Sequence, residues 1–138
     1  MALIKQINTD FLYTEITDKI IHSFYTVYNT LGYGFLEKVY ENAMMLELIE
    51  KGMLAQKQNP IKVHYREKLI GEYFADIIVE EKVIIELKAA EAIVQEHELQ
   101  LINYLKATEI EIGLLLNFGK KPEIKRKIFT NDRKINLR

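Results

Sequence analysis

Two carboxylates and one ammonium interrupt an apolar stretch in the middle of the chain. Between residues 73 and 88, two apolar runs flank a charged segment at 80–82, a pattern that predicts a β-hairpin. With the turn centred on that segment, Asp76 lies opposite Glu86, and Lys88 follows two residues later on the same face. Charges in such a place are costly unless they are paired or bind something. We therefore expect a site that collects a divalent metal ion.

The alternation of side chains along these strands predicts the surroundings of the charges. One face is expected to carry the three charged residues together with Phe74, Ile78 and Ile84. The opposite face is expected to be apolar throughout, with Ala75, Ile77, Val79, Val83, Ile85 and Leu87. Two largely apolar faces are typical of central strands covered on both sides.

A buried structural ion cluster is the alternative interpretation of the three charges. Breaking such a cluster usually costs stability, whereas replacing it by apolar residues often does not. A structural role alone is therefore a poor reason to keep three charges there, and we favour the metal site.

Length and composition favour one domain and exclude several kinds of chemistry. The chain has 138 residues, of which 49% are apolar, enough for a single compact domain with its own core. It has no cysteine, which excludes disulfides, thiolate catalysis and cysteine metal sites. We expect one domain over 1–138, with its core at about 16–129 and terminal extensions at 1–13 and 130–138.

No targeting or membrane segment is visible. The first residues lack the apolar core of a signal peptide, and no apolar run approaches the roughly 18 residues of a membrane helix. We expect a cytoplasmic protein with no membrane partner. The net charge is −1, but residues 120–138 hold eight Lys or Arg and two acids, a charge of +6. This asymmetry indicates either a polyanion-binding edge or a solvated basic terminus.

Periodicity predicts the elements that position the charged residues. Helices are expected at 16–31, from 36 to a stop near Gly52, and at 95–107; strands are expected at 60–65, 70–79, 83–88 and 112–118, with a weaker edge strand at 124–129. The buried side of the second helix should hold Leu36, Val39, Ala43, Leu46 and Ile49, and that of the third Leu99, Ile102 and the stem of Lys106. The order α-α-β-β-β-α-β, with the further edge strand, predicts an α/β fold in which helices flank a mixed central sheet.

Three motifs in this order resemble a known enzyme superfamily. Asp76 followed by Glu86-Leu87-Lys88 resembles the PD-(D/E)XK nuclease signature, although Ala75 stands where proline is usual. The segment from Gly34 through Glu37 to Tyr40 resembles the motif of the GxxExxY family, a branch of that superfamily. Gln100 and Tyr104 resemble the QxxxY helix motif of RecB-like nucleases, and His97 and Asn117-Phe118 also resemble recurring family positions. The resemblance implies a restriction-endonuclease-like core.

The same resemblance implies metal-assisted hydrolysis of phosphodiester bonds in DNA. Asp76 and Glu86 would hold Mg²⁺ or Mn²⁺, with the Leu87 carbonyl and Glu37 as further ligands. Lys88 would orient the attacking water or stabilise charge on the phosphate. The alternative for Glu37 is an ordinary first-turn glutamate, favoured there by the helix dipole.

Four further residues are assigned supporting roles, each with a plainer alternative. Gln100 would support the site or contact the DNA backbone, and Tyr104, on the same helix face, would orient a neighbour; both could instead serve packing. Tyr40 either bonds a site carboxylate or packs. His97 could touch the site, but a lone histidine is more often structural than catalytic. Asn117, outside this group of four, is expected to be a turn residue.

The functional hypotheses come from different classes. The first is a Mg²⁺- or Mn²⁺-dependent deoxyribonuclease whose basic residues Lys125, Arg126 and Lys127 guide the phosphate backbone, with a homodimer or a protein partner supplying specificity. The second is a non-catalytic nuclease-fold module that binds nucleic acid or a protein; no aromatic stacking platform is apparent in the sequence to favour it. The third, a hydrolase of a small phosphorylated metabolite, would need a phosphate cradle that is not visible.

Overall fold

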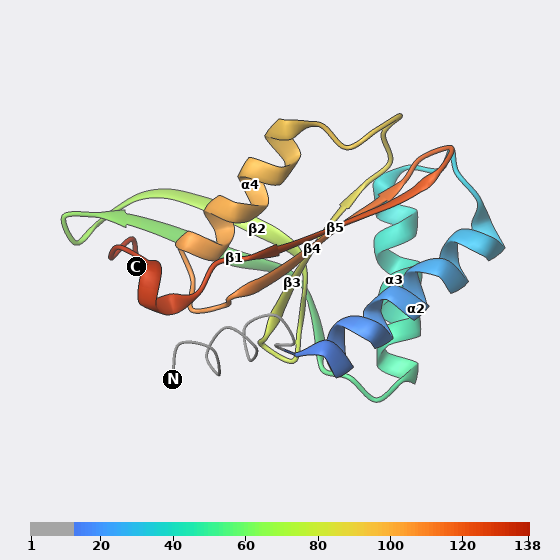
Figure 1. Ribbon diagram of the computed structural model, residues 1–138, viewed down its shortest axis with the longest axis horizontal. Coiled ribbons are helices and arrows are strands. Elements are labelled where there is room, and N and C mark those ends of the chain that lie inside the picture. The colour runs from blue at the N-terminus through green and yellow to red at the C-terminus, as the bar shows by residue number, and fades with distance from the viewer. Residues whose placement is uncertain (1–12) are drawn as a thin grey trace, which may run out of the picture.

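A mixed β-sheet with helices on both faces forms the centre of the molecule (Figure 1). The computed structural model describes residues 13–138. The helices are α2 (Thr14–Leu31), α3 (Glu37–Glu50) and α4 (Gln95–Lys106), followed near the C-terminus by the 3₁₀ turn η1 (Asn131–Arg133). The strands are β1 (Ala55–Tyr65), β2 (Lys68–Val79), β3 (Val83–Lys88), β4 (Ile112–Phe118) and β5 (Pro122–Ile128).

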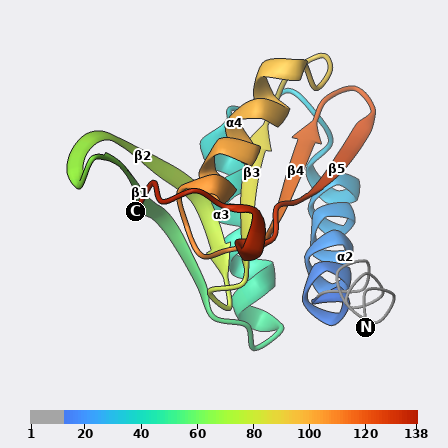
Figure 2. The same cartoon turned by 60° about the vertical axis from the view of Figure 1, so that its left-hand side comes forward.

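The sheet order within the described residues is β1-β2-β3-β4-β5. Neighbouring strands are antiparallel except β3 and β4, which are parallel. A parallel pair needs a crossover connection, and α4 supplies it. Helices α2 and α3 cover one face of the sheet and α4 covers the other (Figures 1 and 2). The predicted α/β fold of restriction-endonuclease-like type, with helices flanking a mixed sheet, is confirmed.

Most of the predicted elements are found with small shifts at their ends. The strand 112–118 has the predicted bounds, because its residues are almost all apolar and every one of them is buried. Strand β1 begins five residues before the predicted start at Pro60. Residues 55–59 are mostly polar and show no alternation, so their pairing with the end of β2 gives no signal in the sequence.

Helix α3 is rotated from its predicted orientation. Leu36, Leu46 and Ile49, expected in the core, are 80%, 70% and 56% exposed. The buried residues of the helix are Tyr40, Glu41, Met44 and Leu48. The prediction was wrong because two stripes of similar apolar content run along this helix, and the stack of Tyr40 on Phe118, with ring centroids 4.1 Å apart, selects the other one.

Helix α4 is also rotated from the prediction. Leu99, expected to face the core, is 50% exposed, so that prediction was wrong, whereas Ile102 and Lys106 are partly buried. Leu101, Tyr104 and Leu105 are the buried residues instead. A β-carbon at Gly113 would lie 2.6 Å from Leu101 Cδ1. The missing side chain of Gly113 on β4 therefore makes the space into which Leu101 packs.

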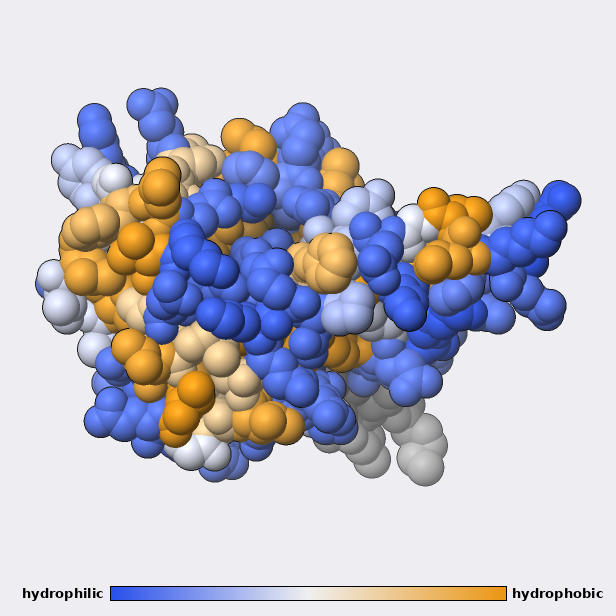
Figure 3. All heavy atoms as spheres, turned by 180° about the vertical axis from the view of Figure 1, so that it is seen from behind, coloured by the Kyte–Doolittle hydropathy of each residue, from blue (hydrophilic) through white to orange (hydrophobic). Residues whose placement is uncertain are grey.

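The rotation leaves apolar surface exposed. Viewed from behind, apolar residues gather over the end of the molecule that carries α2 and α3, and a smaller group lies on the β1–β2 hairpin (Figure 3). The exposed residues of α3 include Val39, Leu46 and Ile49, and those of the hairpin include Leu69 and Ile70. No helix within residues 13–138 is both long and apolar enough to cross a membrane.

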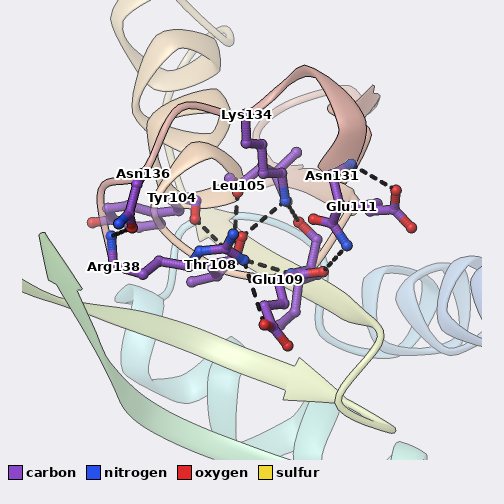
Figure 4. A network of polar contacts seen from close by, with 10 residues as sticks. Tyr104, Leu105, Thr108, Glu109, Glu111, Asn131, Lys134, Asn136 and Arg138 are labelled. Carbon is purple, nitrogen blue, oxygen red and sulfur yellow. Dashed lines mark hydrogen bonds and ion pairs between the residues drawn. The ribbon is translucent and has the colours of Figure 1, made fainter.

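The segment after β5 packs back against the domain (Figure 4). Lys134 Nζ donates to the carbonyl oxygens of Thr108 and Ile110, at 2.9 and 2.8 Å. The His64 backbone N–H on β1 donates to the Leu137 carbonyl at 2.7 Å. The predicted extension at 130–138 is therefore held against β1 and the end of α4. The predicted N-terminal extension lies outside the described residues except for Tyr13.

Candidate functional site

The β2–β3 hairpin has the predicted register. Ile77 pairs with Ile85, Ile78 with Ile84 and Val79 with Val83. The backbone pairing of β2 with β3 ends at Ile77–Ile85. Beyond it, two carboxylate side chains bond to backbone N–H groups of the opposite strand. Glu86 Oε1 accepts from the Asp76 backbone N–H at 3.0 Å, and Asp76 Oδ2 accepts from the Leu87 N–H at 2.8 Å. The two strands thus separate at the two carboxylates, which remain tied across the gap.

Strand β2 changes the direction of its side chains at Asp76. Ala75 packs with Ile78 and Ile84 in the cluster beneath α4, whereas Ile77 packs in the cluster beneath α2 and α3. The prediction that Ala75 and Ile77 share a face was therefore wrong. The β1–β2 ladder is interrupted at the same level, between Lys57–Ile77 and Asn59–Ala75.

Gln58 occupies the interrupted position on β1 with a left-handed backbone, φ 55°. Such a conformation costs a non-glycine residue on the order of 1–3 kcal/mol and is concentrated at functional sites. From this position the Gln58 side chain reaches α3, where its Nε2 donates a hydrogen bond to Glu41 Oε1 at 3.1 Å. The break in the ladder at Gln58 and the change of side-chain direction at Asp76 coincide with an opening on the side of the sheet that faces α3.

A cavity of about 290 Å³ occupies this opening. Its lining residues are Glu37, Lys38, Glu41, Gln58, Asp76 and Leu87. Glu37 and Glu41 lie four residues apart on α3, so they share a helix face. Glu41 is 5% exposed, and its Oε2 lies 3.8 Å from Lys38 Nζ.

Glu41 was not identified from the sequence. The available signal was its spacing from Glu37, which puts both on one face of the helix. We did not use this spacing, because the predicted buried side of α3, with Leu46 and Ile49, placed Glu41 away from the core.

Burial and the charges of neighbouring carboxylates raise the pKa values of Asp76 and Glu86. The pKa of Asp76 is raised by burial first and then by the nearby charges of Glu41 and Glu37, against the lowering effect of the Leu87 N–H. The pKa of Glu86 is raised to about 8, by burial first and then by Asp76. A bound cation reverses this balance because it favours the ionised carboxylates.

The donor chemistry of this cavity fits a hard divalent cation. Asp76 and Glu41 line it with Glu37, and Glu86 is tied to Asp76, which offers the carboxylate oxygens that Mg²⁺ prefers. Burial and neighbouring carboxylates raise both pKa values despite the lowering effect of Lys88, so a bound cation would favour the ionised forms. Among residues 13–138, no three His, Cys, Asp or Glu side chains are already assembled as a metal-binding group.

Lys88 follows Glu86 on β3 and is half-buried. Its positive charge lowers the pKa values of both Asp76 and Glu86, without outweighing their burial. Within the described part of the chain, its ammonium group makes no hydrogen bond or ion pair. Lys88 is thus a cation near the carboxylate pair and is not committed to another partner.

The loop after Lys88 is anchored by Asn117, which pairs with Lys88 in the parallel ladder. Asn117 Oδ1 accepts from the Ala90 N–H at 2.9 Å, and its Nδ2 donates to the Ala90 carbonyl and to Glu123 Oε1, each at 3.0 Å. A β-carbon at Gly119 would collide with the Ala90 carbonyl oxygen. Asn117 was expected to be a turn residue, and it is a buried anchor at the end of β4.

Gln100 and Tyr104 lie on α4, on the other side of the sheet from the cavity. Gln100 Nε2 donates to the Tyr104 hydroxyl at 2.7 Å. The pKa of Tyr104 is raised to about 12, by burial first and then by the charge of Glu86, with a smaller contribution from Asp76. The charges of Glu86 and Asp76 therefore act on the Tyr104 hydroxyl from across the α4 side. The charges of Glu37 and Glu41 act on Asp76 from α3.

Tyr40 and His97 do not line the cavity. The Tyr40 hydroxyl donates to the Gly32 carbonyl at 2.8 Å and accepts from the Phe35 N–H at 3.2 Å, so it holds the α2–α3 connection. His97 Nδ1 accepts from the Val94 backbone N–H at 3.3 Å at the start of α4. Both residues position the helices that carry other candidates.

The basic residues of β5 do not form one patch. Lys125 and Lys127 lie opposite Leu115 and Gly113, on the α4 face, whereas Arg126 lies opposite Leu114, on the α2 face. Lys127 Nζ is also paired with Glu98 Oε1 on α4 at 2.6 Å. Alternation along the strand therefore separates the three charges.

Comparisons with known proteins agree with this geometry. Residues 14–127 match the model of a family described as the PD-(D/E)XK nuclease superfamily. A solved structure described as "Crystal structure of SSO0001" is similar in fold, with a TM-score of 0.55 and 16% identity over 67% of this chain. The chain spans 50% of the length of that solved chain. No curated protein sequence matches it significantly.

Proposed function

Since the chain belongs to the PD-(D/E)XK nuclease superfamily, we propose that it is a metal-dependent nuclease that hydrolyses phosphodiester bonds in DNA. The observation that carries the proposal is the tied pair of Asp76 and Glu86 at the point where β2 and β3 separate, with Lys88 beside it. One buried and one half-buried carboxyl with raised pKa values, near an ammonium group that has no ion-pair partner among the described residues, are typical of a functional site.

The cofactor in this proposal is Mg²⁺ or Mn²⁺. Asp76, Glu86 and Glu41 would hold it, with the Leu87 carbonyl and Glu37 as further oxygen donors. When bound, the cation would polarise the scissile phosphate and lower the pKa of a bound water.

The protein groups have separate roles in this proposal. The Leu87 N–H orients Asp76, and Gln58 orients Glu41, so two carboxylates are fixed before substrate arrives. Lys88 would hold the attacking water or stabilise negative charge on the phosphate. The Tyr104–Gln100 pair would support Glu86 from the α4 side.

A finer classification is part of the proposal. The segment from Gly34 to Tyr40 favours the GxxExxY branch, because its tyrosine closes the α2–α3 connection and its helix presents Glu37 to the cavity. The Gln100–Tyr104 hydrogen bond favours the RecB-like branch. A single domain over 1–138, a cytoplasmic location, a homodimer and a protein partner that supplies specificity stay predictions from the sequence.

A non-catalytic module that binds nucleic acid or a protein is the second candidate. One observation favours it, since both carboxylates are already bonded to backbone N–H groups, an arrangement that serves structure without a metal ion.

Cleavage of labelled DNA distinguishes the two candidates. Single- and double-stranded substrates are incubated with Mg²⁺, Mn²⁺ or EDTA, comparing the wild type with Lys88→Ala and Glu86→Gln. We expect metal-dependent cutting that each variant reduces by at least about 100-fold, as for the loss of one charge-stabilising group.

Two variants of α3 test the newly identified glutamate. Glu41→Gln should lower the rate by about 10- to 100-fold, a range typical of groups that orient or complete a metal site. Glu47→Gln is the matched control on the same helix, because among residues 13–138 the Glu47 side chain pairs with Lys51 and lies outside the cavity. Absence of cutting by folded wild type on linear, circular and RNA substrates would reject catalysis in favour of the binding module.

A further inference from the structure

A second and larger cleft is lined by residues of β1, β2 and α4, on the other side of the sheet from the first cavity. Its volume is about 530 Å³, within the range of ligand-binding clefts. Leu137 of the C-terminal segment also lines it. We call it the hairpin–helix cleft and define it by Gly71, Tyr73, Leu99, Gln100, Asn103 and Tyr104.

The hairpin–helix cleft presents an aromatic ring that the core does not use. Tyr73 is 50% exposed, and its ring centroid lies 5.6 Å from that of the buried Tyr104, with the rings tilted by 45°. Leu99, also 50% exposed, lines the same cleft from α4. A flat apolar ligand could therefore stack on Tyr73 and contact Leu99.

The polar groups of the cleft suit the edge of a base and not a phosphate. Gln100 and Asn103 carry amides, which both donate and accept hydrogen bonds. The charged residue among the lining residues is Glu96, and no Lys or Arg of the described chain lines the cleft. The Glu96 carboxylate would repel a phosphate inside the cleft, whereas it would not repel a neutral base.

Tyr104 lies between the cleft and the α4 side of the carboxylate pair, whereas the cavity lined by Asp76 opens on the other face of the sheet. Gln100 lines the cleft and donates to the Tyr104 hydroxyl at 2.7 Å. The charges of Glu86 and Asp76 act on that hydroxyl. Ile84 packs beneath α4 whereas Ile85 and Leu87 pack on the opposite face, so alternation places Glu86 on the α4 face of β3, and a strand whose backbone reaches Glu86 from this face would have its neighbouring bases near the cleft.

We propose that the hairpin–helix cleft binds an unpaired nucleobase of the substrate strand, stacked on Tyr73 with its edge toward Gln100 and Asn103. The proposal rests on the proposed function and adds a substrate class, which is single-stranded nucleic acid or a strand with an extruded base. A base inside a duplex has no free face for the tyrosine, whereas an unpaired base does. The aromatic platform that the sequence did not reveal is formed by hairpin and helix together.

Metal-free binding tests this proposal separately from catalysis. The anisotropy of a fluorescein-labelled short oligothymidylate is measured in EDTA with wild type, Tyr73→Ala and Tyr65→Ala. Base–aromatic stacking contributes about 1–3 kcal/mol per base, so Tyr73→Ala should bind about 5- to 100-fold more weakly. Tyr65, at the end of β1, is 56% exposed and lies outside the cleft; its replacement should leave affinity unchanged.

Two further measurements identify the base as the bound group. On an oligonucleotide of the same length made of abasic nucleotides, wild type and Tyr73→Ala should bind equally, because the group that stacks is missing. Gly71→Val places a side chain in the cleft, and among the described residues a β-carbon there meets one atom within 4 Å, Tyr73 Cε2 at 3.8 Å. Valine also suits a strand, so this variant should fold and should also lose affinity for oligothymidylate.

The outcomes separate the two proposals. Equal oligothymidylate binding by wild type and Tyr73→Ala would overturn the cleft proposal, even where metal-dependent cleavage is observed. Loss of binding through Tyr73, without any cleavage, would support the cleft and reject catalysis. Stronger binding of duplex than of single strands, or loss on the abasic strand equal to that on oligothymidylate, would also overturn it.

Discussion

Replacing Glu86 by glutamine removes a buried ionisation that opposes folding in the metal-free protein. The pKa of Glu86 is raised from 4.5 to about 8 in the folded state. Between these pH values the folded protein holds a proton that the unfolded chain has released, so the free energy of unfolding falls as pH rises. Stability linked to this group is complete below about pH 4.5 and is lost as pH passes 8.

The size of the effect follows from the pKa difference. At about 1.36 kcal/mol for each pKa unit, the shift from 4.5 to about 8 sets an upper limit of about 5 kcal/mol. Relaxation and water penetration reduce such penalties, and we expect wild type to lose about 2–4 kcal/mol between pH 5 and pH 9. Glutamine keeps the oxygen that accepts from the Asp76 N–H at 3.0 Å and does not ionise. Glu86→Gln should therefore lose much less.

Urea unfolding followed by circular dichroism measures this difference. Wild type, Glu86→Gln and the α3 control Glu47→Gln are compared in EDTA at pH 5, 7 and 9 and constant ionic strength. The variant should match wild type at pH 5 and exceed it at pH 9, and added Mg²⁺ at pH 8 should stabilise wild type more than the variant. Equal pH dependence of wild type and Glu86→Gln would refute the assignment of a costly buried charge to Glu86.

Three further variants test how the site is positioned. Tyr40→Phe keeps the stack on Phe118 but leaves the Gly32 carbonyl and the Phe35 N–H without their partner, so urea unfolding should show a loss of about 1–2 kcal/mol; no loss would mean that water replaces the hydroxyl. Gly113→Ala places a β-carbon 2.6 Å from Leu101 Cδ1 and should lower the melting temperature by overpacking, at about 1–3 kcal/mol. An unchanged melting temperature would mean that α4 shifts freely. Asn117→Ala removes three hydrogen bonds that hold Ala90 and Glu123 and should reduce DNA cleavage more than Lys127→Ala does, measured at equal folded fractions; equal rates would remove Asn117 from the positioning of Lys88.

Local patterns in the sequence determined the elements and the hairpin register. Strand 112–118 is apolar throughout and the charged segment at 80–82 sits between two apolar runs, so strand bounds and the pairing of Ile77 with Ile85 follow from neighbouring residues alone. The family motifs likewise depend on spacing along the chain. These features need no knowledge of distant contacts.

Only the tertiary structure decided which faces of the helices are buried. Helix α3 has two stripes of comparable apolar content, and the contact of Tyr40 with Phe118 selects the one that brings Glu41 into the cavity. Helix α4 turns Leu101 inward because Gly113 leaves room for it. In both helices the deciding partner is on another element, so helical periodicity could not identify it.

The separation of the strands at Asp76 was also beyond the sequence. Alternation predicts that Ala75 and Ile77 share a face, but they pack in different cores, at the level where the β1–β2 ladder is broken at Gln58. The chain itself specified which chemical groups are available for the site. Their meeting in one cavity depends on packing between α3, β1 and the hairpin, because contacts between distant segments, and not local preference, set the rotation of each element.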